Sequence, residues 1–417
     1  MSQILSCIIY HRDESGHITR IEKPYGGNEK MENVKLKLSV VGIGNGGCQV
    51  CSHLAKNGHR VFCINSSQKD LDESILAKNI PSYLIGDKRG AGRNRDTAKE
   101  FMKIELNKLF SNSVFTNLTD DADIIVVIAS MGGGTGSGTG PLLVNRIQAM
   151  YPNKAVIFFG ILPKHSESAQ AQFNALDCMK EVSNEKYPMT YMLADLSNFE
   201  DCASDEAYQK IAAYALDCMN VLRGDYNSES PYGMIDENDM LTILAETGYM
   251  MINRVSNISQ KELDKRSIQS MMIDKISHGE AARFQKDRIV RKIGVIINTP
   301  SSANDPSRNG DFSELQEYTG YPLDTFVNYA VCDAPKGDAA VIMTGMSKPI
   351  DRMTECKDIA LKAEAAFNSR NTGSIEDEMR DLAFIANAKT ASREKIFNKG
   401  LDSASATTIG DDIPDIF

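Results

Sequence analysis

Residues 131–140 have the sequence MGGGTGSGTG and follow the apolar run IIVVIA at residues 124–129, with only Ser130 between them. Glycine loses more conformational entropy on folding than any other residue, so a run of glycines this dense needs a structural reason. A flexible linker is one reason, but a linker is not expected between two regular elements. The apolar run predicts a strand buried on both faces, and PLLVNRIQAM at residues 141–150 predicts a helix with Pro141 in its first turn. We therefore interpret the glycine-rich segment as a binding loop.

The position of this loop favours an anionic ligand. In parallel sheets, ligands bind outside the carboxyl ends of the strands. The backbone N–H groups of a glycine-rich turn form a concave anion site, and the following helix N-terminus adds partial positive charge. The hydroxyl groups of Thr135, Ser137 and Thr139 offer further donors. A phosphate group is the expected ligand.

Two further glycine clusters have a similar setting. GIGNGG at residues 42–47 lies between a predicted strand and a predicted helix, and RGAGRN at residues 89–94 precedes another predicted helix. One such cluster is weak evidence of a binding site. Three clusters at successive strand ends predict a single di- or triphosphate that several loops surround.

Two common nucleotide motifs fit this sequence less well. A P-loop needs Gly-Lys-Ser/Thr after its glycines, and none of the three clusters has it. Gly42, Gly44 and Gly47 match the spacing of a dinucleotide-binding fold, but the second strand ends in Asn65 and not in the acid that would bind the ribose. An NAD-binding oxidoreductase is therefore a remote alternative, and it leaves the segment 131–140 unexplained.

The composition limits the possible functions further. The chain has 417 residues, which predicts two or three domains, and its net charge of −10 argues against direct binding along DNA. No apolar run reaches the roughly 18 residues needed to cross a membrane, so no membrane partner is expected. The 9 cysteines lack regular spacing, which indicates a reducing, cytoplasmic location. Cys48 and Cys51 form a lone C-x-x-C pair, which we interpret as buried helix cysteines and not as a metal or redox site.

Strand–helix alternation begins at residue 34 and predicts an α/β fold with a parallel sheet. A long helix is expected at 205–223, where apolar residues recur at helical spacing, and the segment 238–255 is interpreted as a helix with strand-like edges. Helices are expected again at 350–369 and 375–388. The expected strands lie at 34–43, 60–65, 81–86, 124–129, 155–163 and 189–195, and in a smaller α+β part at 292–300, 325–334 and 338–349.

These motifs together resemble the tubulin/FtsZ superfamily of GTPases. MGGGTGSGTG resembles the signature loop of that family, and its GSG followed by GPLL is closer to tubulin than to FtsZ. GIGNGG resembles the first nucleotide loop of FtsZ, FCINSSQKDL at 62–71 resembles the segment of its second strand, and GAGRN resembles its third loop. MIDENDMLTILAETGYMM at 234–251 resembles the synergy loop and the helix after it. The resemblance runs in order from about residue 36 to 350.

The resemblance implies a Rossmann-like parallel-sheet GTPase domain, a long core helix, a smaller α+β domain, a C-terminal helix and a disordered tail. The expected divisions are an N-terminal extension with a small hairpin at 1–33, a GTP-binding domain at 34–204, the core helix and synergy loop at 205–240, an activation domain at 241–349, C-terminal helices at 350–400 and an acidic tail at 401–417.

The resemblance also implies GTP or GDP as the ligand, with Mg²⁺ held mainly by phosphates and water. Tyr208 is expected to stack on guanine, although a core tyrosine is an equal alternative, and Ala171 stands where FtsZ has an arginine of the ribose wall. Lys88, Arg89, Arg93 and Arg95 either sense the γ-phosphate or face water. The expected nucleotide-binding residues are Gly44, Asn45, Gly46, Asn65, Ala91, Gly92, Gly132, Gly133, Gly134, Thr135, Gly136, Glu167, Asp195, Asn198 and Tyr208.

Asp236 and Asp239 are the expected catalytic residues. They occupy MIDENDM at residues 234–240, where Asp is also favoured as a helix N-cap. In the family, this loop enters the nucleotide pocket of the next subunit, and its acids position water against the γ-phosphate. The resemblance therefore implies a head-to-tail filament in which assembly switches on hydrolysis.

Several features favour the plasmid- and phage-borne branch of the family, TubZ, over the cell-division branch. The synergy loop lacks the Phe of the FtsZ sequence NVDFAD, and the loop RGDYNSESPYG at 223–233 is enlarged. This branch segregates DNA through a DNA-binding adaptor, so DNA contact would be indirect. KTASREKIFNK at 389–399 is a candidate adaptor site or a solvated helix end. DDIPDIF at 411–417 resembles the FtsZ tail peptide, which keeps an FtsZ-like division role as the alternative.

Overall fold

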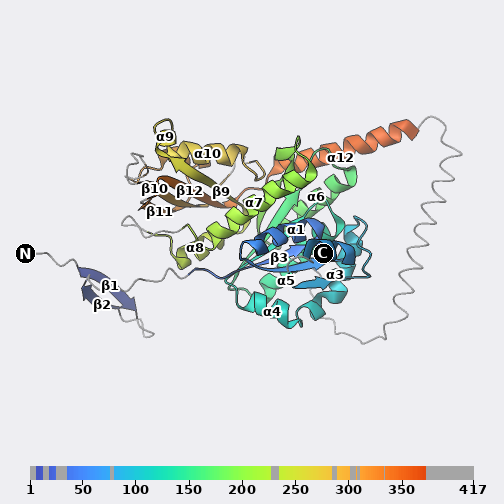
Figure 1. Cartoon of the computed structure of the whole chain (residues 1–417), viewed down its shortest axis with the longest axis horizontal. Coiled ribbons are helices and arrows are strands. Elements are labelled where there is room, and N and C mark those ends of the chain that lie inside the picture. The colour runs from blue at the N-terminus through green and yellow to red at the C-terminus, as the bar shows by residue number, and fades with distance from the viewer. Residues whose placement is uncertain are drawn as a thin grey trace, which may run out of the picture.

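The computed structural model describes residues 6–12, 18–24, 35–75, 79–226, 234–283, 289–300, 307, 310–332 and 334–371. Within them, ten strands form one sheet in the order β11-β10-β12-β9-β8-β7-β6-β3-β4-β5 (Figure 1). The sheet changes character at β9, which pairs parallel with β8 and antiparallel with β12. All strand pairs from β5 to β8 are parallel, whereas β9, β12 and β10 pair antiparallel.

The strands of the first half of the sheet alternate with helices, as the sequence predicts, with two helices between β5 and β6. Its strands are β3 (Leu38–Ile43), β4 (Arg60–Asn65), β5 (Ser82–Leu84), β6 (Ile124–Ser130), β7 (Ala155–Leu162) and β8 (Thr190–Asp195). Its helices are α1 (Gly44–Lys56), α2 (Gln68–Ile75), α3 (Arg95–Leu109), α4 (Ser113–Asp120), α5 (Gly134–Met150) and α6 (Ala169–Val182). All residues of β6 except Ser130 are buried, because helices cover both faces of the sheet.

The second half is the smaller α+β part. It begins with a short 3₁₀ turn (Leu196–Phe199) and the long helix α7. Its elements are α7 (Ser204–Leu222), α8 (Glu237–Leu244), β9 (Gly248–Ser259), α9 (Gln260–Leu263), α10 (Ile268–His278), β10 (Lys292–Pro300), α11 (Ser313–Thr319), β11 (Asp324–Cys332), β12 (Lys336–Met346) and α12 (Ile350–Asn371). This arrangement confirms the predicted fold class.

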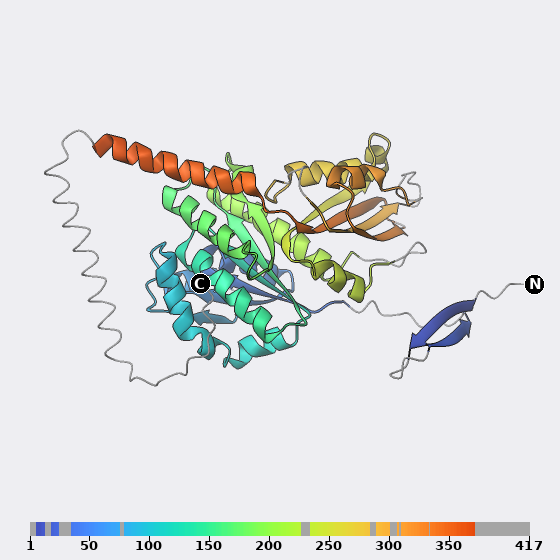
Figure 2. The same cartoon turned by 180° about the vertical axis from the view of Figure 1, so that it is seen from behind.

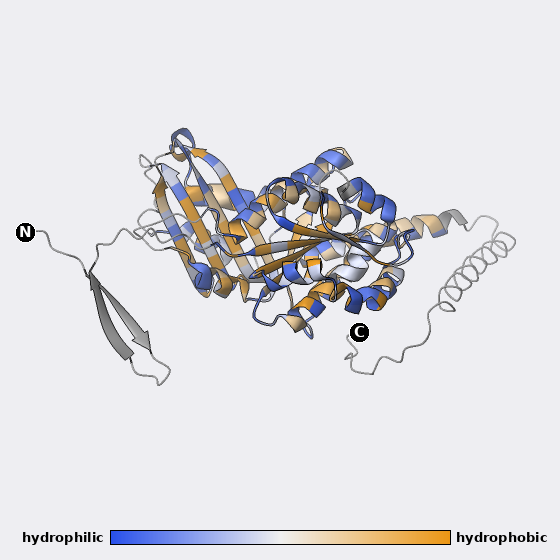
Figure 3. Cartoon of the chain, turned by 60° about the horizontal axis from the view of Figure 1, so that its bottom comes forward, coloured by the Kyte–Doolittle hydropathy of each residue, from blue (hydrophilic) through white to orange (hydrophobic). Residues whose placement is uncertain are grey.

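Helices form layers on the two faces of the parallel half. Helices α1, α2 and α7 pack together on one face, whereas α3, α5 and α6 pack together on the other, and α12 lies on α6 (Figures 1 and 2). The strands are mainly hydrophobic, and hydrophilic residues lie on the outer helices (Figure 3). None of the described helices is both long and apolar enough to cross a membrane.

Helix α7 joins the two halves, as the predicted core helix should. Its residues Ile211, Ala215, Cys218 and Leu222 follow one face at intervals of three or four residues and are fully buried. The hydroxyl of Tyr214 donates a hydrogen bond of 2.9 Å to the carbonyl oxygen of Ile252 in β9. The helix therefore packs against the sheet of the second half as well as against α1.

The segment 238–255 was expected to be mainly helical, and this prediction is wrong. Helix α8 ends at Leu244, and β9 begins at Gly248, whose φ of +113° is accessible to glycine and strained for other residues. The β-strand that follows is buried between β8 and β12, so tertiary packing outweighs the helical spacing of its apolar residues.

Helix α5 begins earlier than predicted. It starts at Gly134, so Pro141 lies inside the helix and not in its first turn. Proline has no N–H group, which leaves the carbonyl of Ser137, four residues before it, without its helical partner. Arg95 supplies the missing donor at 2.9 Å. The glycine-rich segment is thus mostly the first two turns of a helix.

The N-terminal extension contains the predicted hairpin, in which β1 (Ser6–Arg12) pairs antiparallel with β2 (Ile18–Pro24). The predicted helix at 375–388, the candidate adaptor segment at 389–399 and the acidic tail at 401–417 lie outside the described residues.

The close approach of α1 to β6 gives a prediction about stability. A Cβ atom at Gly47 would lie 2.3 Å from the carbonyl oxygen of Ile128, which is fixed in the sheet. We expect Gly47→Ala to lower the free energy of unfolding by about 1–3 kcal/mol, measured by urea denaturation. Gly133→Ala is the control, because its φ is −83° and a Cβ atom there meets nothing within 4 Å. Equal losses in the two variants would contradict the packing argument.

Candidate nucleotide-binding site

A cavity of about 680 Å³ lies at the carboxyl ends of β3, β4 and β6. It brings together three glycine-rich segments that are far apart in the sequence, as predicted. The expected residues that line it are Gly44, Asn45, Gly46, Asn65, Ala91, Gly92, Gly132, Gly133, Gly134, Thr135, Gly136, Glu167 and Tyr208.

Two helix N-termini face this cavity. Helices α1 and α5 begin at Gly44 and Gly134, and neither N-terminus has a side-chain cap. The N–H groups of a first helical turn have no partners within the helix, so they are available to an anion. Gly44 has a φ of +69°, and a Cβ atom there would lie 3.1 Å from the backbone nitrogen of Gly136. The absence of side chains therefore allows the two N-termini to approach the same ligand.

Asn65 offers a donor that the described protein atoms do not use. Its Oδ1 accepts a hydrogen bond of 2.8 Å from the backbone nitrogen of Ser66. Its Nδ2 is buried and has no hydrogen-bond partner among the described residues. A buried amide without a partner is costly, so this atom fits a site that a polar ligand completes. Beside it, the hydroxyls of Ser66 and Thr135 share a hydrogen bond of 2.7 Å.

The loop before α3 is fixed against the central glycine loop. A Cβ atom at Gly134 would lie 2.7 Å from the carbonyl carbon of Arg93. The buried side chain of Asn174 donates to the carbonyl oxygens of Arg93 and Gly132, both at 3.0 Å. Arg93 has a left-handed backbone, with φ of +61°, which this packing maintains. The loop therefore holds Arg93 at the edge of the cavity.

The four basic residues of this loop have different positions. Arg89 and Arg93 line the cavity, whereas Lys88 and Arg95 do not. Arg95 forms an ion pair of 2.9 Å with Glu181 and also binds the carbonyl of Ser137. Only Arg89 and Arg93 are thus placed to meet an anionic ligand in the cavity.

Glu167 and Tyr208 line the cavity next to the glycine loops. Oε1 of Glu167 accepts a hydrogen bond of 3.0 Å from the backbone nitrogen of Lys164. The hydroxyl of Tyr208 donates to Oγ of Ser130 at 3.3 Å, and burial raises the pKa of Tyr208, so the phenol stays neutral. The half-buried ring lies against Gly46, where a Cβ atom would meet the Tyr208 oxygen at 2.9 Å.

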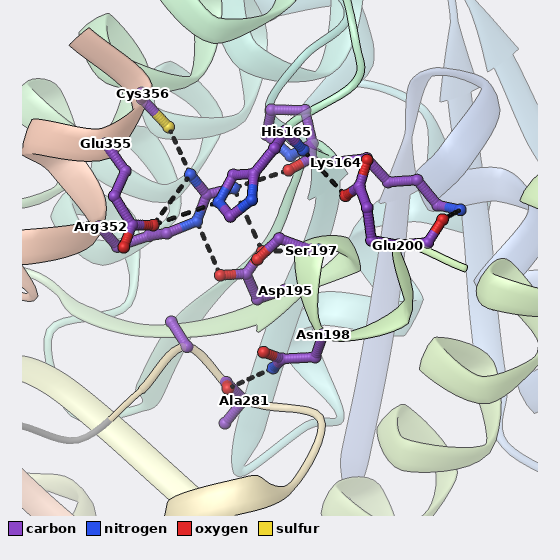
Figure 4. A network of polar contacts seen from close by, with 12 residues as sticks. Lys164, His165, Asp195, Ser197, Asn198, Glu200, Ala281, Arg352, Glu355 and Cys356 are labelled. Atoms are coloured by element: carbon purple, nitrogen blue, oxygen red, sulfur yellow. Dashed lines mark hydrogen bonds and ion pairs between the residues drawn. The ribbon is translucent and has the colours of Figure 1, made fainter. Parts of the chain in front are cut away.

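The structure does not place Asp195 and Asn198 at the cavity. Oδ2 of Asp195 accepts a hydrogen bond of 2.7 Å from Nε of the buried Arg352 in α12 (Figure 4). Asn198 donates to the carbonyl oxygens of Gly279 and Ala281, both at 3.0 Å. Both side chains have structural partners, and we correct the expectation that they contact the ligand. Burial alone would lower the pKa of Arg352, but the Asp195 carboxylate more than offsets this and the pKa is raised.

Some lining residues are not among the expected nucleotide-binding residues, although Arg89, Arg93 and Ala171 were considered from the sequence. The segment after Asn65 contains three of them, Ser66, Ser67 and Asp70, and was part of the family resemblance, so its polar residues could have been included. Ser204 and Asp205 come from the N-terminus of α7, and no motif in the sequence points to them. The additional residues are Ile43, Gln49, Ser66, Ser67, Asp70, Arg89, Gly90, Arg93, Ser130, Ala171, Ser204 and Asp205.

Asp236 and Asp239 form a reciprocal capping box at the start of α8. Oδ1 of Asp236 accepts a hydrogen bond of 2.8 Å from the backbone nitrogen of Asp239, and the carboxylate of Asp239 accepts one of 3.3 Å from the nitrogen of Asp236. Neither residue lines the cavity. The structural role considered from the sequence therefore applies to both acids, and the exposed Asp236 also remains accessible to another molecule.

Helix α8 lies at the other edge of the parallel sheet. Its residues Leu241 and Leu244 line a second cavity of about 570 Å³, together with Ala155 and Thr190 at the amino ends of β7 and β8. The first cavity lies at the carboxyl ends of the strands. Helix α7 begins at the first cavity, has 19 residues and thus spans about 28 Å toward α8 (Figure 1). One chain therefore cannot bring Asp236 to its own glycine loops.

The cysteine pair of the first helix lies next to a third cysteine. Cys48, Cys51 and Cys63 are all buried, and hydrogen bonds from the first two lower the pKa of Cys63 to about 5. Among the described residues, no group of three or more His, Cys, Asp or Glu side chains is arranged to hold a metal ion.

Comparisons with known proteins agree with this geometry. Residues 37–187 match the family model described as Tubulin/FtsZ family, GTPase domain. The chain is 25% identical over 378 residues to the tubulin-like protein TubZ of a Clostridium botulinum C phage, which covers 87% of this chain and 96% of the relative.

Solved structures show the same fold at lower identity. A GTPγS-bound protofilament of CetZ2 from Haloferax volcanii has a TM-score of 0.65 and 20% identity, covering 79% of this chain and 100% of that chain. A GTPγS-form protofilament of TubZ from Bacillus thuringiensis serovar israelensis has a TM-score of 0.64 and 16% identity, covering 81% and 95%.

The capping box predicts different effects for two substitutions of Asp236. Asp236→Ala removes the acceptor for the Asp239 nitrogen, so we expect a loss of about 1 kcal/mol in the free energy of unfolding. Asn caps helices as well as Asp does, so Asp236→Asn is expected to retain the stability of the parent chain. Urea denaturation of the three chains measures this. A loss as large in Asp236→Asn would show that charge, and not capping, stabilises α8.

Proposed function

We propose that the chain assembles head to tail and hydrolyses GTP at the contact between subunits, starting from the match of residues 37–187 to the family model described as Tubulin/FtsZ family, GTPase domain. The observation that carries the proposal is the separation of two groups in one chain. The phosphate-binding loops line a cavity at one edge of the sheet, and the carboxylates of α8 lie toward the other edge. A complete site needs both groups, so it needs two chains.

The cavity supplies plausible contacts for each part of the nucleotide. The uncapped N-termini at Gly44 and Gly134 would bind phosphates, and Glu167 would accept hydrogen bonds from the ribose hydroxyls. Tyr208 would stack on the base, which is worth about 1–3 kcal/mol per base in other nucleic-acid sites. Mg²⁺ would be held mainly by phosphate oxygens and water, and Asp70 is one of the carboxylates that line the same cavity.

The chemistry requires little more than positioning and charge. Phosphoryl transfer to water depends mainly on orientation of the attacking water and on stabilisation of charge on the phosphoryl oxygens. We assign the first task to Asp236 and Asp239 of the adjoining subunit, and the second to the backbone N–H groups of the glycine loops and to Arg93. Assembly would then switch hydrolysis on, because it brings the two sets of groups together.

The end of the molecule that carries α8 has a suitable contact surface. Ile289, Tyr321 and Leu323 have exposed fractions of 67%, 70% and 80%. Two neighbouring residues connect this patch to α8. The carbonyl oxygen of Arg291 accepts a hydrogen bond of 2.9 Å from the Leu323 nitrogen. Nζ of the next residue, Lys292, donates one of 3.0 Å to the carbonyl oxygen of Thr242 in α8. Exposed apolar groups of this kind favour association. A contact between unlike ends does not close on itself and produces a filament.

We further propose that such filaments segregate plasmid or phage DNA. The similarity to phage TubZ over nearly the whole length of that relative supports this role. The acidic net charge of −10 disfavours direct DNA contact, so a DNA-binding adaptor would bind the C-terminal region. We also propose that the chain is divided as expected from its sequence, with boundaries at 34–204, 205–240, 241–349 and 350–400.

The first prediction concerns the dependence of hydrolysis on assembly. Phosphate release per chain is expected to be very low in dilute protein and to rise steeply above the concentration at which filaments pellet with GTP. Asp239→Asn retains an acceptor for the Asp236 nitrogen but removes the charge, so its filaments should form with GTP, persist and release little phosphate. Normal turnover in Asp239→Asn would remove this residue from the mechanism. GDP, ATP and NAD serve as ligand controls.

The second prediction concerns Arg93. We expect Arg93→Ala to weaken binding of GTPγS about tenfold, the equivalent of one charge-assisted hydrogen bond, and to change GDP binding much less. Fluorescence competition with the two nucleotides measures this selectivity. Lys88→Ala is the control, because Lys88 does not line the cavity. If the affinities for GTPγS and GDP fall equally, Arg93 does not contact the terminal phosphate.

The third prediction separates DNA segregation from cell division. Filaments formed with GTP should pellet together with centromere DNA when the matching adaptor is present, and should leave the DNA in solution without it. Removal of residues 389–417 should abolish this pelleting and leave filament formation intact. Failure with every adaptor encoded beside the gene would favour the division role.

A further inference from the structure

Helix α12 is fixed to the parallel half by one buried arginine. Only 6% of the Arg352 side chain and 2% of the Asp195 side chain are exposed. Nε and Nη2 of Arg352 donate to the two oxygens of Asp195 at 2.7 and 3.3 Å, and Nη2 also donates to the carbonyl oxygen of Pro163 at 2.7 Å (Figure 4). A buried ion pair is tolerated when further hydrogen bonds satisfy both partners. Here the additional acceptors are the backbone carbonyl of Pro163 in a loop and, for Nη1, the sulfur of Cys356 at 3.1 Å.

That loop, residues 163–168, leads directly to the nucleotide cavity. The next residue after Pro163 is Lys164, whose backbone nitrogen donates to Oε1 of Glu167 at 3.0 Å. Glu167 lines the cavity. Arg352 thus contacts the peptide unit whose other end, the Lys164 nitrogen, orients the Glu167 carboxylate.

Other contacts fix this loop on the side away from α12. A change in the position of the loop would therefore come from α12. The side chain of Lys164 is buried and donates to the carbonyl oxygens of Glu200 and Cys202. The Glu200 carboxylate accepts hydrogen bonds from the backbone nitrogens of His165 and Ser166. These contacts hold the loop from the side of residues 195–202. On the other side, His165 lies 3.2 Å from Glu355, which also belongs to α12. The loop is therefore clamped between α12 and the segment before α7.

We propose that Arg352 is a positioning residue for Glu167, and that docking of α12 sets the affinity of the cavity for the nucleotide. This inference rests on the proposed function, since it needs a guanine nucleotide in the cavity. In this inference α12 not only covers α6 but also controls how tightly the cavity binds the nucleotide. A protein partner that binds and shifts α12 would then change the affinity for the nucleotide. Because such coupling is reciprocal, the nucleotide would change the affinity for that partner by the same factor.

A double-mutant cycle on the full chain tests the inference with GDP, so hydrolysis and assembly do not enter. Arg352→Lys keeps the positive charge but loses the fork that contacts Asp195 and Pro163 together. Glu167→Gln removes the charge that this fork is inferred to position. We expect each variant to weaken GDP binding about tenfold, and the double variant to bind GDP no more than about twofold weaker than either one.

The control is a second arginine that links two acids elsewhere. Arg254 pairs with Asp217 at 2.9 Å and with Asp338 at 2.6 Å and does not line the cavity. Arg254→Lys should leave GDP affinity within about twofold of the parent. If Arg352→Lys does not fold, Asp195→Asn replaces it in the cycle, because this change loosens the same arginine with little change in volume.

The two hypotheses fail in different ways. If the parent chain binds no guanine nucleotide, the proposed function fails and this inference fails with it. If the parent binds GDP but the losses from Arg352→Lys and Glu167→Gln multiply in the double variant, the proposed function stands and the inference is overturned. An unchanged GDP affinity in Arg352→Lys, or in Asp195→Asn when it takes its place, overturns the inference as well.

Discussion

The length and direction of α7 determine how far the acids at α8 lie from the glycine loops of the same chain. In a parallel sheet the carboxyl ends of all strands lie at one edge, so the glycine loops that follow β3 and β6 meet there. Helix α7 starts at that edge, and its 19 residues lead about 28 Å toward α8. Because a packed helix does not bend back on itself, the carboxylates of α8 and the glycine loops of one chain remain apart. This separation is the basis of the proposal that GTP is hydrolysed at a site shared between two subunits of a filament.

The site itself depends on close backbone approaches that only small residues allow. Gly46 permits the Tyr208 ring to lie against α1, and Gly134 permits Arg93 to lie against α5. The cost of Pro141 inside α5 is offset by Arg95, which donates to the carbonyl that the proline leaves free and at the same time pairs with Glu181. Of these neighbouring arginines, Arg95 has structural partners and Arg93 lines the cavity.

The glycine clusters predicted the cavity from the sequence because they carry two local signals together, backbone freedom and a position between a strand and a helix. The fold class followed from the strand–helix alternation for the same reason. Asp195 was expected at the site because the family resemblance implies a base- or sugar-binding residue near that position. Its true partner, Arg352, is 157 residues away, and no local pattern reports such a contact. The switch from helix to strand at Gly248 was missed because packing between β8 and β12, and not local propensity, decides it.

The measurement that tests the account most directly mixes two defective chains. Asp239→Asn retains the cavity but lacks one carboxylate, whereas Gly133→Asp places a negative charge where phosphate would bind and keeps the acids of α8. Each chain alone should release almost no phosphate from GTP. In mixtures that pellet together, we expect phosphate release to be greatest when the two chains are present in near equal amounts. The intact cavity of one chain then meets the intact acids of the other most often. Mixtures that pellet together but release no more phosphate than the separate chains would contradict a site shared between subunits.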